Sequence, residues 1–302
     1  MFEEEAHKPT KPFLKWAGNK FRIIDRVDGI IVEYKGDRSK YIEPFGGSGA
    51  VAVNVAHRFT GLKTYAEFNP ELVDLMRAIK EELPDLIDKT EELFSPKNND
   101  ASRYYDFRKK FNGYVKSGET GNVLKSALFI YLNRHCFNGL CRYGPNGFNV
   151  PFGRYAKTVA PIDEMKAFAN LMKDVEVAGP KSFEETMKDA DADTLVYCDP
   201  PYFPLTLTSN FTQYSDKSGF GLEMQERLAV AAAECAKRDA VVLISNHNTD
   251  ACRQLYEDVV AGPKFKGVTV DFSYFPVPRF ISSKGKDRGR LAAELIAIFK
   301  KG

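Results

Sequence analysis

The feature that most constrains the fold of this chain is an alternation of short, apolar, β-branched segments with helical patterns near both ends. The segments with the composition of strands are 41–45, 64–68, 193–199, 240–246, 267–275 and 294–299. Helical patterns lie between them, among them 49–59 and 222–237. Because such alternation is typical of a wound sheet covered by helices, we predict an α/β fold.

The middle of the chain breaks this alternation. Two helical stretches, 103–116 and 121–134, are followed by a loop rich in Gly, Asn, Arg and aromatic residues, with no clear strand. We therefore predict a mostly helical insertion between two halves of one sheet. The predicted domains are a first catalytic part at 10–95, the insertion at 96–158 and a second catalytic part at 159–302.

Charge is distributed unevenly along the chain. Residues 103–157 contain ten Lys or Arg against two acidic residues, and 279–290 contain five against one. Because the formal net charge is only +2, the rest of the chain is acidic. Two basic surfaces on an acidic body are typical of a protein that contacts a nucleic-acid backbone. The basic residues could instead simply solvate a helix face.

Several functional classes find no support in the composition. No apolar run reaches 18 residues, which argues against a membrane span, and the acidic N-terminus does not resemble an export signal. We expect a cytoplasmic protein, at the nucleoid of a bacterium or in the host cytoplasm if phage-encoded. The five scattered cysteines include no C-x-x-C pair, so we expect free thiols and no metal site.

A glycine-rich turn, Glu43–Gly49, joins a predicted strand to a predicted helix. Glycines at the carboxyl end of such a strand let the backbone approach a ligand, although the same residues could form only a tight turn. Glu67 follows about 20 residues later, where an acidic side chain can accept hydrogen bonds from both hydroxyls of a ribose. The spacing fits neither a dinucleotide fingerprint nor a P-loop, which favours a cofactor with ribose but no pyrophosphate.

A second motif, Asp199-Pro200-Pro201-Tyr202, follows the apolar strand at 193–199. Two prolines make the turn rigid. The Asp199 carboxylate and the Pro200 carbonyl can then accept both hydrogens of one amino group, while Tyr202 stacks on the planar base that carries it. A proline-rich turn without a catalytic role is the alternative.

At these motifs the chain resembles the Dam-type (D12 class) DNA adenine-N6 methyltransferases, from about Pro12 to Phe299. The similar segments are 13–20, 43–49, 131–143, 148–155, 199–202, 243–247 and 281–283. The family usually has Gly in place of Asn19 and Asp in place of Glu67. The longer carboxylate of Glu67 can still reach a ribose.

The resemblance implies a Rossmann-like sheet that binds S-adenosylmethionine, with an inserted domain that recognises duplex DNA at GATC. The cofactor-binding residues it implies are Trp16, Lys20, Phe45, Gly46, Gly47, Gly49, Glu67, Phe183 and Asp199. Trp16 could also be only a core aromatic. No metal and no obligate protein partner are implied.

The resemblance also assigns DNA contacts. In the family, the segment that matches 137–142 recognises the target sequence and fills the space left by a flipped base. We expect Leu140 and Arg142 to set specificity, and Phe137 and Asn138 to intercalate or contact bases. Further expected DNA contacts are Lys15 to a base, Arg108, Arg154 and Arg279 to phosphates, and Pro151, Tyr155 and Ser282 in the similar segments.

We expect the methyl group to pass directly from the cofactor to the adenine amine. Hydrogen bonds from the adenine amine to Asp199 and Pro200 make its nitrogen lone pair available for in-line attack on the sulfonium methyl group, after the base has flipped out of the duplex. No covalent enzyme intermediate is needed, in agreement with the absence of a cysteine placed as a nucleophile.

Alternatives to this reading remain. The enzyme could belong to a restriction–modification system with a different recognition sequence. Relatives with Asn-Pro-Pro-Tyr methylate protein glutamine or RNA bases, and a DNA-binding protein that no longer transfers methyl groups could keep the same fold. A nicotinamide oxidoreductase fits least, because its glycine fingerprint is missing.

Overall fold

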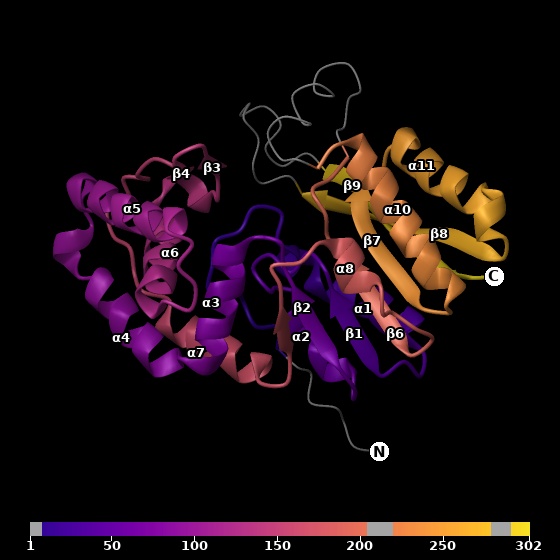
Figure 1. The fold of residues 1–302 in the computed structure, drawn as a ribbon, viewed down its shortest axis with the longest axis horizontal. Coiled ribbons are helices and arrows are strands. Elements are labelled where there is room, and N and C mark those ends of the chain that lie inside the picture. Colours follow the sequence, from indigo (N-terminus) through magenta and orange to yellow (C-terminus); the bar gives the residue numbers. More distant parts are fainter. Residues whose placement is uncertain (1–7, 204–219, 279–290) are drawn as a thin grey trace. The chain divides into compact units, whose positions relative to one another are not determined.

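Two compact units make up the computed structural model, which describes residues 8–203, 220–278 and 291–302 (Figure 1). The described part of unit 1 comprises 8–28, 46–57 and 67–180. Unit 2 comprises 29–45, 58–66 and the described residues from 181 onward. The chain therefore passes repeatedly from one unit to the other.

A mostly parallel sheet forms the centre of unit 2. Six of the seven strands that the structure describes in this sheet belong to this unit: β1 (Lys40–Glu43), β2 (Lys63–Ala66), β6 (Thr194–Cys198), β7 (Val241–His247), β8 (Val268–Pro278) and β9 (Leu291–Lys301), in the order β2-β1-β6-β7-β9-β8. Parallel pairing joins β2, β1, β6 and β7, whereas β9 is antiparallel to β7 and β8. Tyr41 lies opposite Lys63 and Leu195. The carboxyl ends of β1, β6 and β7 thus share the edge at which α/β sheets bind ligands.

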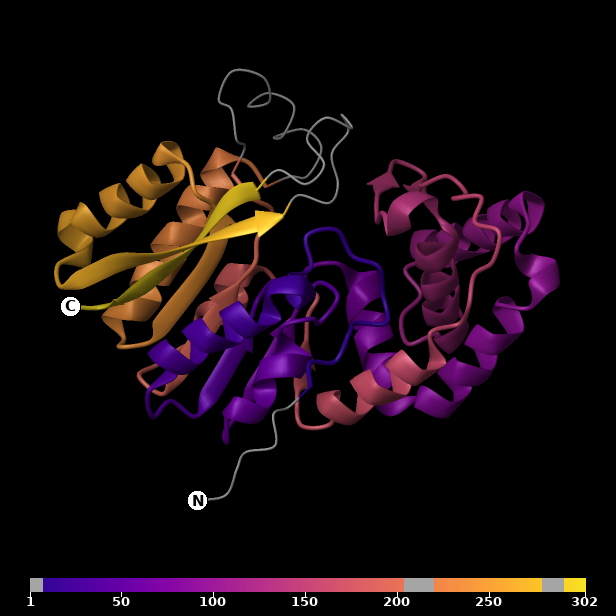
Figure 2. The same ribbon diagram turned by 180° about the vertical axis from the view of Figure 1, so that it is seen from behind.

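Helices α10 (Leu222–Lys237) and α11 (Asp250–Ala261) cover one face of this sheet (Figures 1 and 2). The apolar residues of α10 recur at helical spacing and are fully buried: Leu228, Ala229, Ala232, Ala233 and Ala236. Their small side chains allow close packing against β7 and β9. The short helix α8 (Phe183–Met187) begins with a capping box formed by Ser182 and Glu185.

Unit 1 is mostly helical. Its elements include α2 (Ala52–Val55), α3 (Pro70–Glu81), α4 (Leu83–Leu93), α5 (Ala101–Lys116), α6 (Val123–His135), α7 (Ile162–Met172), β3 (Tyr143–Gly144), β4 (Gly147–Phe148) and β5 (Glu176–Ala178). Helix α1 (Ile24–Lys35) begins in this unit and ends in unit 2. Side chains of Asn69, Asp100 and Asn122 accept hydrogen bonds from the first backbone N–H groups of α3, α5 and α6.

A buried ion pair joins α3 to α6. Lys125 donates to the Asp74 carboxylate at 2.9 Å and to the Glu119 carbonyl at 2.6 Å, and it lies 3.8 Å from Glu71. Because a buried charge is costly unless it is paired, this arrangement fixes how α6 packs against α3. Helix α6 is buried along almost its whole length, so it forms the centre of unit 1.

The structure confirms the predicted α/β class and every predicted strand, with small shifts at the ends. The helix predicted over 49–59 is wrong in extent: only α2 and a 3-10 helix, Ala56–Arg58, form there. Gly47 and Gly49 have positive φ, which delays the start of the helix. Residues 143–148 form the hairpin β3–β4, where no clear strand was predicted.

The boundaries of the units fall at other residues than the predicted domain boundaries at 96 and 158. Helix α4 packs against α6, and α3 and α7 pack against each other, so these helices belong with the inserted ones in unit 1. Sequence order alone does not show this grouping, because the apolar faces of α3 and α4 fit either unit.

Candidate functional site

The glycine-rich turn after β1 packs directly against Trp16. Gly47 and Gly49 have φ values of +49° and +73°, in the left-handed region that favours glycine. A Cβ at Gly47 would lie 2.9 Å from the indole nitrogen of Trp16, and one at Gly49 would lie 2.5 Å from the Phe168 ring. The turn therefore needs glycine at both positions, and it lies beside one of the predicted cofactor-binding aromatics.

Glu67 is bound to the same turn. Its carboxylate accepts hydrogen bonds from the backbone N–H groups of Gly47 at 3.0 Å, Phe68 at 2.9 Å and Asn69 at 3.0 Å. Burial raises the pKa of Glu67 above its ordinary value, although these three donors act in the opposite direction. The carboxylate and the glycine turn thus form one corner of unit 1, called the glycine corner below, in which backbone N–H groups hold a carboxylate.

Asn19 and Lys20 stabilise the segment that carries Trp16. Asn19 caps the 3-10 helix Lys20–Ile23: its side chain accepts from Phe21 N–H at 3.2 Å and donates to the Trp16 carbonyl at 3.0 Å. Its φ of −59° does not require glycine, so the departure from the family pattern adds a cap without backbone strain. The ammonium of Lys20 is buried and donates to the Gly18 carbonyl at 2.9 Å.

The Asp199–Tyr202 turn leaves the fully buried strand β6 in unit 2. Asp199 is half-buried and Pro200 is buried. The Tyr202 hydroxyl donates to Glu294 at 3.1 Å, and its ring meets the His247 ring edge-on, with 4.9 Å between centroids. Burial, followed by the carboxylates of Asp199 and Glu294, raises the pKa of Tyr202 well above its ordinary value. Tyr202 is therefore a neutral, oriented aromatic group next to a carboxylate.

Phe45 and Phe183, both predicted to bind cofactor, lie together in unit 2. Their rings stack with 5.6 Å between centroids, and Phe220 meets the Phe45 ring edge-on at 5.6 Å. Phe183 is only 4% exposed, so its ring belongs to the core cluster as well. Sequence reasoning did not identify Phe220, which no motif marks.

In unit 1, the segment that starts at Phe137 folds back on residues 151–155. Phe137 N–H donates to the Pro151 carbonyl and Asn138 N–H to the Tyr155 hydroxyl, both at 2.9 Å. Asn138 has a left-handed φ of +56°, a conformation that asparagine tolerates. The Phe137 side chain is 51% exposed, and that of Asn138 is exposed too. The backbone is thus held while both predicted DNA-contacting side chains stay accessible.

Arg142 stands at the start of the β3–β4 hairpin. Its Nε donates to the Asn149 side chain at 2.7 Å, and Asn149 N–H donates to the Arg142 carbonyl at 3.0 Å. Asn149 therefore orients an exposed guanidinium group. Leu140, two residues earlier, is half-buried.

Lys15 lies in the segment 13–20, which is predicted to bind cofactor and is called the cofactor segment, and it contacts the predicted recognition segment, 137–142. Its ammonium lies 4.3 Å from the Tyr155 ring centroid and donates to the Arg134 carbonyl at 3.2 Å. Burial, and then the charge of Arg134, lowers the pKa of Lys15. The buried Asn133 side chain accepts from Lys15 N–H at 2.9 Å and donates to the Lys15 carbonyl at 2.7 Å and the Gly139 carbonyl at 3.3 Å.

The predicted phosphate-binding arginines differ in their surroundings. Arg108 lies over the Tyr105 ring at 4.7 Å and donates to the Val150 carbonyl at 3.1 Å, so part of its role is to support the loop after β4. Arg154 is exposed and has a left-handed φ of +54°. Arg279 and Ser282 lie outside the described residues.

The family described as D12 class N6 adenine-specific DNA methyltransferase matches residues 16–270. The chain belongs to this family. Among its relatives, the DNA adenine methylase of Escherichia coli is 38% identical over 298 residues, which covers 98% of this chain and 97% of that protein. The DNA adenine methylase of Haemophilus influenzae is 38% identical over 305 residues, with the same coverage. That of Vibrio cholerae serotype O1 is 37% identical over 296 residues, or 97% of each chain.

The chain is therefore an adenine-specific DNA methyltransferase. Its cysteine thiols are protonated at neutral pH because burial raises their pKa. Cys198, directly before Asp199, is fully buried, and burial raises its pKa well above the ordinary value. Burial also raises the pKa of Cys136 to about 11 and that of Cys141 to about 12. Thiols with such pKa values stay protonated and do not act as nucleophiles.

Two kinds of feature are absent from the described part of this methyltransferase. Among residues 8–203, 220–278 and 291–302, no group of three or more His, Cys, Asp or Glu is arranged to hold a metal ion. None of the helices described there is long and apolar enough to cross a membrane.

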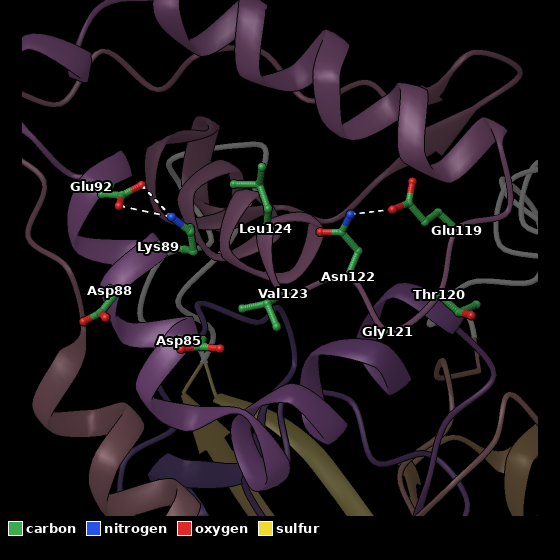
Figure 3. Close-up of a pocket in the computed structure, with 10 residues that line it drawn as sticks. All are labelled: Asp85, Asp88, Lys89, Glu92, Glu119, Thr120, Gly121, Asn122, Val123 and Leu124. Carbon is green, nitrogen blue, oxygen red and sulfur yellow. Dashed lines mark hydrogen bonds and ion pairs between the residues drawn. The ribbon is translucent and has the colours of Figure 1, made fainter.

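A pocket in unit 1 of the methyltransferase is lined by none of the predicted site residues (Figure 3). It lies between α4 and the α5–α6 turn, and most of its charged side chains are acidic: Asp85, Asp88, Glu92 and Glu119, with Lys89 the one base. Lys89 is paired with Glu92 at 3.1 Å. Because this lining repels phosphate, the pocket does not fit the DNA backbone.

The structure also identifies residues of the methyltransferase that sequence reasoning missed. Glu294 and His247 contact Tyr202, Asn149 contacts Arg142, and Asn133 contacts Lys15. Asn133, Asn149 and His247 carried a signal, since they lie in the segments 131–143, 148–155 and 243–247 that resemble the family. Glu294 lies in no such segment, and its partner Tyr202 is far away in sequence.

Proposed function

We propose that this methyltransferase transfers the methyl group of S-adenosylmethionine to the N6 amine of adenine in duplex DNA, within the sequence GATC. The observation that carries the proposal is the Asp199–Tyr202 turn at the end of β6, with Tyr202 oriented by Glu294 and His247. The similarity to proteins named DNA adenine methylase supports the substrate. The resemblance of 131–155 to the family's recognition segment supports the target sequence.

The residues of the glycine corner fit the proposed cofactor. Glu67 offers a carboxylate to the ribose hydroxyls, and the side-chain-free Gly47 allows close approach beside the flat indole of Trp16. We assign Lys20, Gly46 and Gly49 to the same site, and Phe45 and Phe183 to the apolar surface that receives the adenine. Bound S-adenosylmethionine supplies a methyl group activated by a sulfonium centre.

We assign catalysis to two hydrogen-bond acceptors, on Asp199 and Pro200, and to the aromatic ring of Tyr202. The Asp199 carboxylate and the Pro200 carbonyl accept the hydrogens of the adenine amine, which makes the nitrogen lone pair available to the methyl carbon. Tyr202 stacks on the base after it has flipped out of the duplex. Orientation of the amine contributes several of the roughly 7–11 kcal/mol attributed to proximity.

DNA recognition is assigned to unit 1. The guanidinium of Arg142, oriented by Asn149, donates to a guanine edge in the major groove, and Lys15 contacts a second base. Leu140, Phe137 and Asn138 enter the duplex at the flipped base, with Pro151 and Tyr155 supporting their segment. Arg108 and Arg154 of this unit bind phosphates, and Arg279, which follows this unit in the chain and lies outside the described residues, is assigned the same role.

Two measurements test the proposal. Expression in cells without adenine methylation, followed by mapping of modified bases, should place N6-methyladenine at GATC. In single-turnover assays Asp199→Ala should lose methyl transfer while keeping DNA affinity, whereas Asp189→Ala, an exposed aspartate of unit 2, should behave as wild type. Near-wild-type transfer by Asp199→Ala would refute the catalytic assignment, and methylation elsewhere would refute the target sequence.

A further inference from the structure

The backbone on both sides of Tyr202 is held by side chains from other elements of unit 2. Before it, the Pro201 carbonyl accepts from Gln225 Nε2 at 2.7 Å. After it, Phe203 N–H donates to Asn246 Oδ1 at 2.8 Å, and the Phe203 carbonyl accepts from His247 Nδ1 at 2.7 Å. The catalytic turn is thus tied to α10 through Gln225 and to the end of β7 through Asn246 and His247.

Asn246 is fully buried, and its amide uses its full hydrogen-bonding capacity. Its oxygen accepts from the N–H groups of Phe203 and His247, the latter at 2.9 Å. Its nitrogen donates to Gln225 Oε1 at 3.1 Å and to the Tyr256 hydroxyl at 2.9 Å. These partners permit only one orientation of the amide, since a backbone N–H can only donate.

The hydrogen-bond partners of Gln225 fix the orientation of its amide in the same way. It is 2% exposed, and its Nε2 faces the Pro201 carbonyl, which can only accept. Its Oε1 accepts from Asn246. Gln225 and Asn246 therefore form a continuous chain of hydrogen bonds from the peptide group before Tyr202 to the peptide group after it. No motif in the sequence marks Gln225.

We propose that Gln225 and Asn246 are positioning residues for methyl transfer: together they fix the two peptide groups that flank Tyr202 and thereby orient its ring and the adjoining Pro200 carbonyl. The inference rests on the proposed role of the Asp199–Tyr202 turn. Neither side chain is assigned a contact with the reacting atoms, so their effect passes through the turn. A displacement of about 1 Å at a reacting group can cost about 100-fold in rate, so small changes in this network should alter kcat.

Gln225→Glu isolates the bond to Pro201. The substitution keeps the size of the side chain and an oxygen that accepts from Asn246, but an ionised carboxylate cannot donate to the Pro201 carbonyl. Burial favours the neutral carboxyl, whose O–H can donate to that carbonyl again. We expect kcat at pH 8 to fall by about 10- to 100-fold, with KM for DNA and cofactor little changed, and the deficit to shrink as the pH is lowered to 6.

The readout is the ratio of variant to wild-type kcat at each pH, because titration of Asp199, His247 or Glu294 is common to both proteins. Burial raises the pKa of Tyr202 and Tyr256 well above the ordinary value and that of Cys252 to about 12, so these groups stay protonated throughout. Wild-type kcat at all pH values in both folded Gln225→Glu and folded Gln225→Met would overturn the proposal, because methionine cannot donate to the Pro201 carbonyl in any ionisation state.

Tyr256→Phe is the matched control. It removes one partner of Asn246 but leaves both bonds to the turn, so we expect reduced thermal stability with kcat near wild type. If Gln225→Glu does not fold, Gln225→Met, which cannot donate at any pH, should show the kcat loss with unchanged KM; equal kcat in Gln225→Met and Tyr256→Phe would overturn the proposal. Asp199→Ala separates the two hypotheses, since its activity tests the catalytic turn without involving Gln225.

Discussion

Two opposing effects act on the pKa of Glu67. Three backbone N–H groups favour its ionised form, yet burial is the larger influence and raises its pKa. The carboxylate is therefore protonated at a higher pH than an exposed glutamate would be. Since we propose that a ribose hydroxyl donates its hydrogen to the ionised carboxylate of Glu67, protonation should weaken cofactor binding.

We predict that the affinity of the wild-type protein for S-adenosylmethionine decreases as the pH falls through the raised pKa of Glu67. Glu67→Gln keeps a carbonyl acceptor but cannot ionise, so it should bind about tenfold more weakly at neutral pH and show a flatter pH profile. Calorimetric titrations from pH 5 to 8 measure both quantities. The same pH dependence in wild type and variant would show that Glu67 is not the titrating group.

At this scale the sequence identified residues that stand in motifs and missed those that act through distant partners. Asp199, Tyr202 and Glu67 could be proposed because each stands in a motif whose chemistry suggests a role, and Trp16 could be proposed because its segment resembles the family. Gln225 could not, because a glutamine on an amphipathic helix is normally an exposed polar residue, and only the fold brings it to the Pro201 carbonyl.

Among the elements, α6 links the predicted recognition segment to the cofactor segment through the side chain of Asn133. Asn133 binds both the N–H and the carbonyl of Lys15, and it reaches the Gly139 carbonyl. A Cβ at Gly139 would lie 2.3 Å from the Cβ of Lys15, so the two backbones are in close contact. Helix α6 thus sets the position of the predicted recognition segment relative to Lys15 and its neighbour Trp16.

We predict that Asn133→Ala reduces discrimination between GATC and sites with one changed base pair by about tenfold in kcat/KM, because Lys15 loses its register with the recognition segment. The variant should also lose about 1–3 kcal/mol of unfolding free energy for each backbone group left unpaired. Methylation of matched oligonucleotides and urea unfolding provide the two measurements.

Asn54→Ala is the control for this prediction. Asn54 is buried on α2 and binds the N–H of Thr10 at 2.7 Å and its carbonyl at 2.9 Å, the same bidentate pattern on the same N-terminal segment. It should lose similar stability without a change in sequence discrimination. Equal discrimination in both variants would mean that Asn133 has only a structural role.

Elements were predictable where local pattern and tertiary packing agree. Strands β6 and β7 are continuous apolar runs buried on both faces, which the sequence shows directly. The hairpin β3–β4 has too few residues in each strand for an alternating pattern, and Asn112 completes it by bonding to the N–H and carbonyl of Phe148 from helix α5. Nothing in the sequence of the hairpin itself indicates these hydrogen bonds from α5.

For the whole molecule, the charge pattern matters more than the net charge. The overall value of +2 hides the basic stretch of 103–157, which contributes α5, α6 and the predicted recognition segment to unit 1. Lys109 and Lys110 are exposed on α5. Because each phosphate contact releases counterions, such residues control the salt dependence of DNA binding more than its sequence preference.

We predict that replacing both Lys109 and Lys110 by Gln reduces the slope of log K against log salt by about 2, since each contact contributes about 0.9. The effect should be equal for GATC-containing and random duplexes in fluorescence anisotropy titrations. Replacing Lys181 and Lys188, exposed in unit 2, should leave the slope unchanged. A slope that stays at the wild-type value in the α5 variant would exclude these lysines from the interface.

The repeated passage of the chain between the two units bears on how the protein is made. On the ribosome, β1 can pair early with β2, since Tyr41 and Lys63 are close in sequence, but Leu195 on its other side emerges only after all of unit 1. The edge of β1 that pairs with β6 stays unpaired throughout that interval, and an unpaired strand edge favours aggregation. Unit 1 can thus fold during synthesis, whereas the sheet that carries the proposed catalytic turn is completed only when β9 has emerged, near the end of translation.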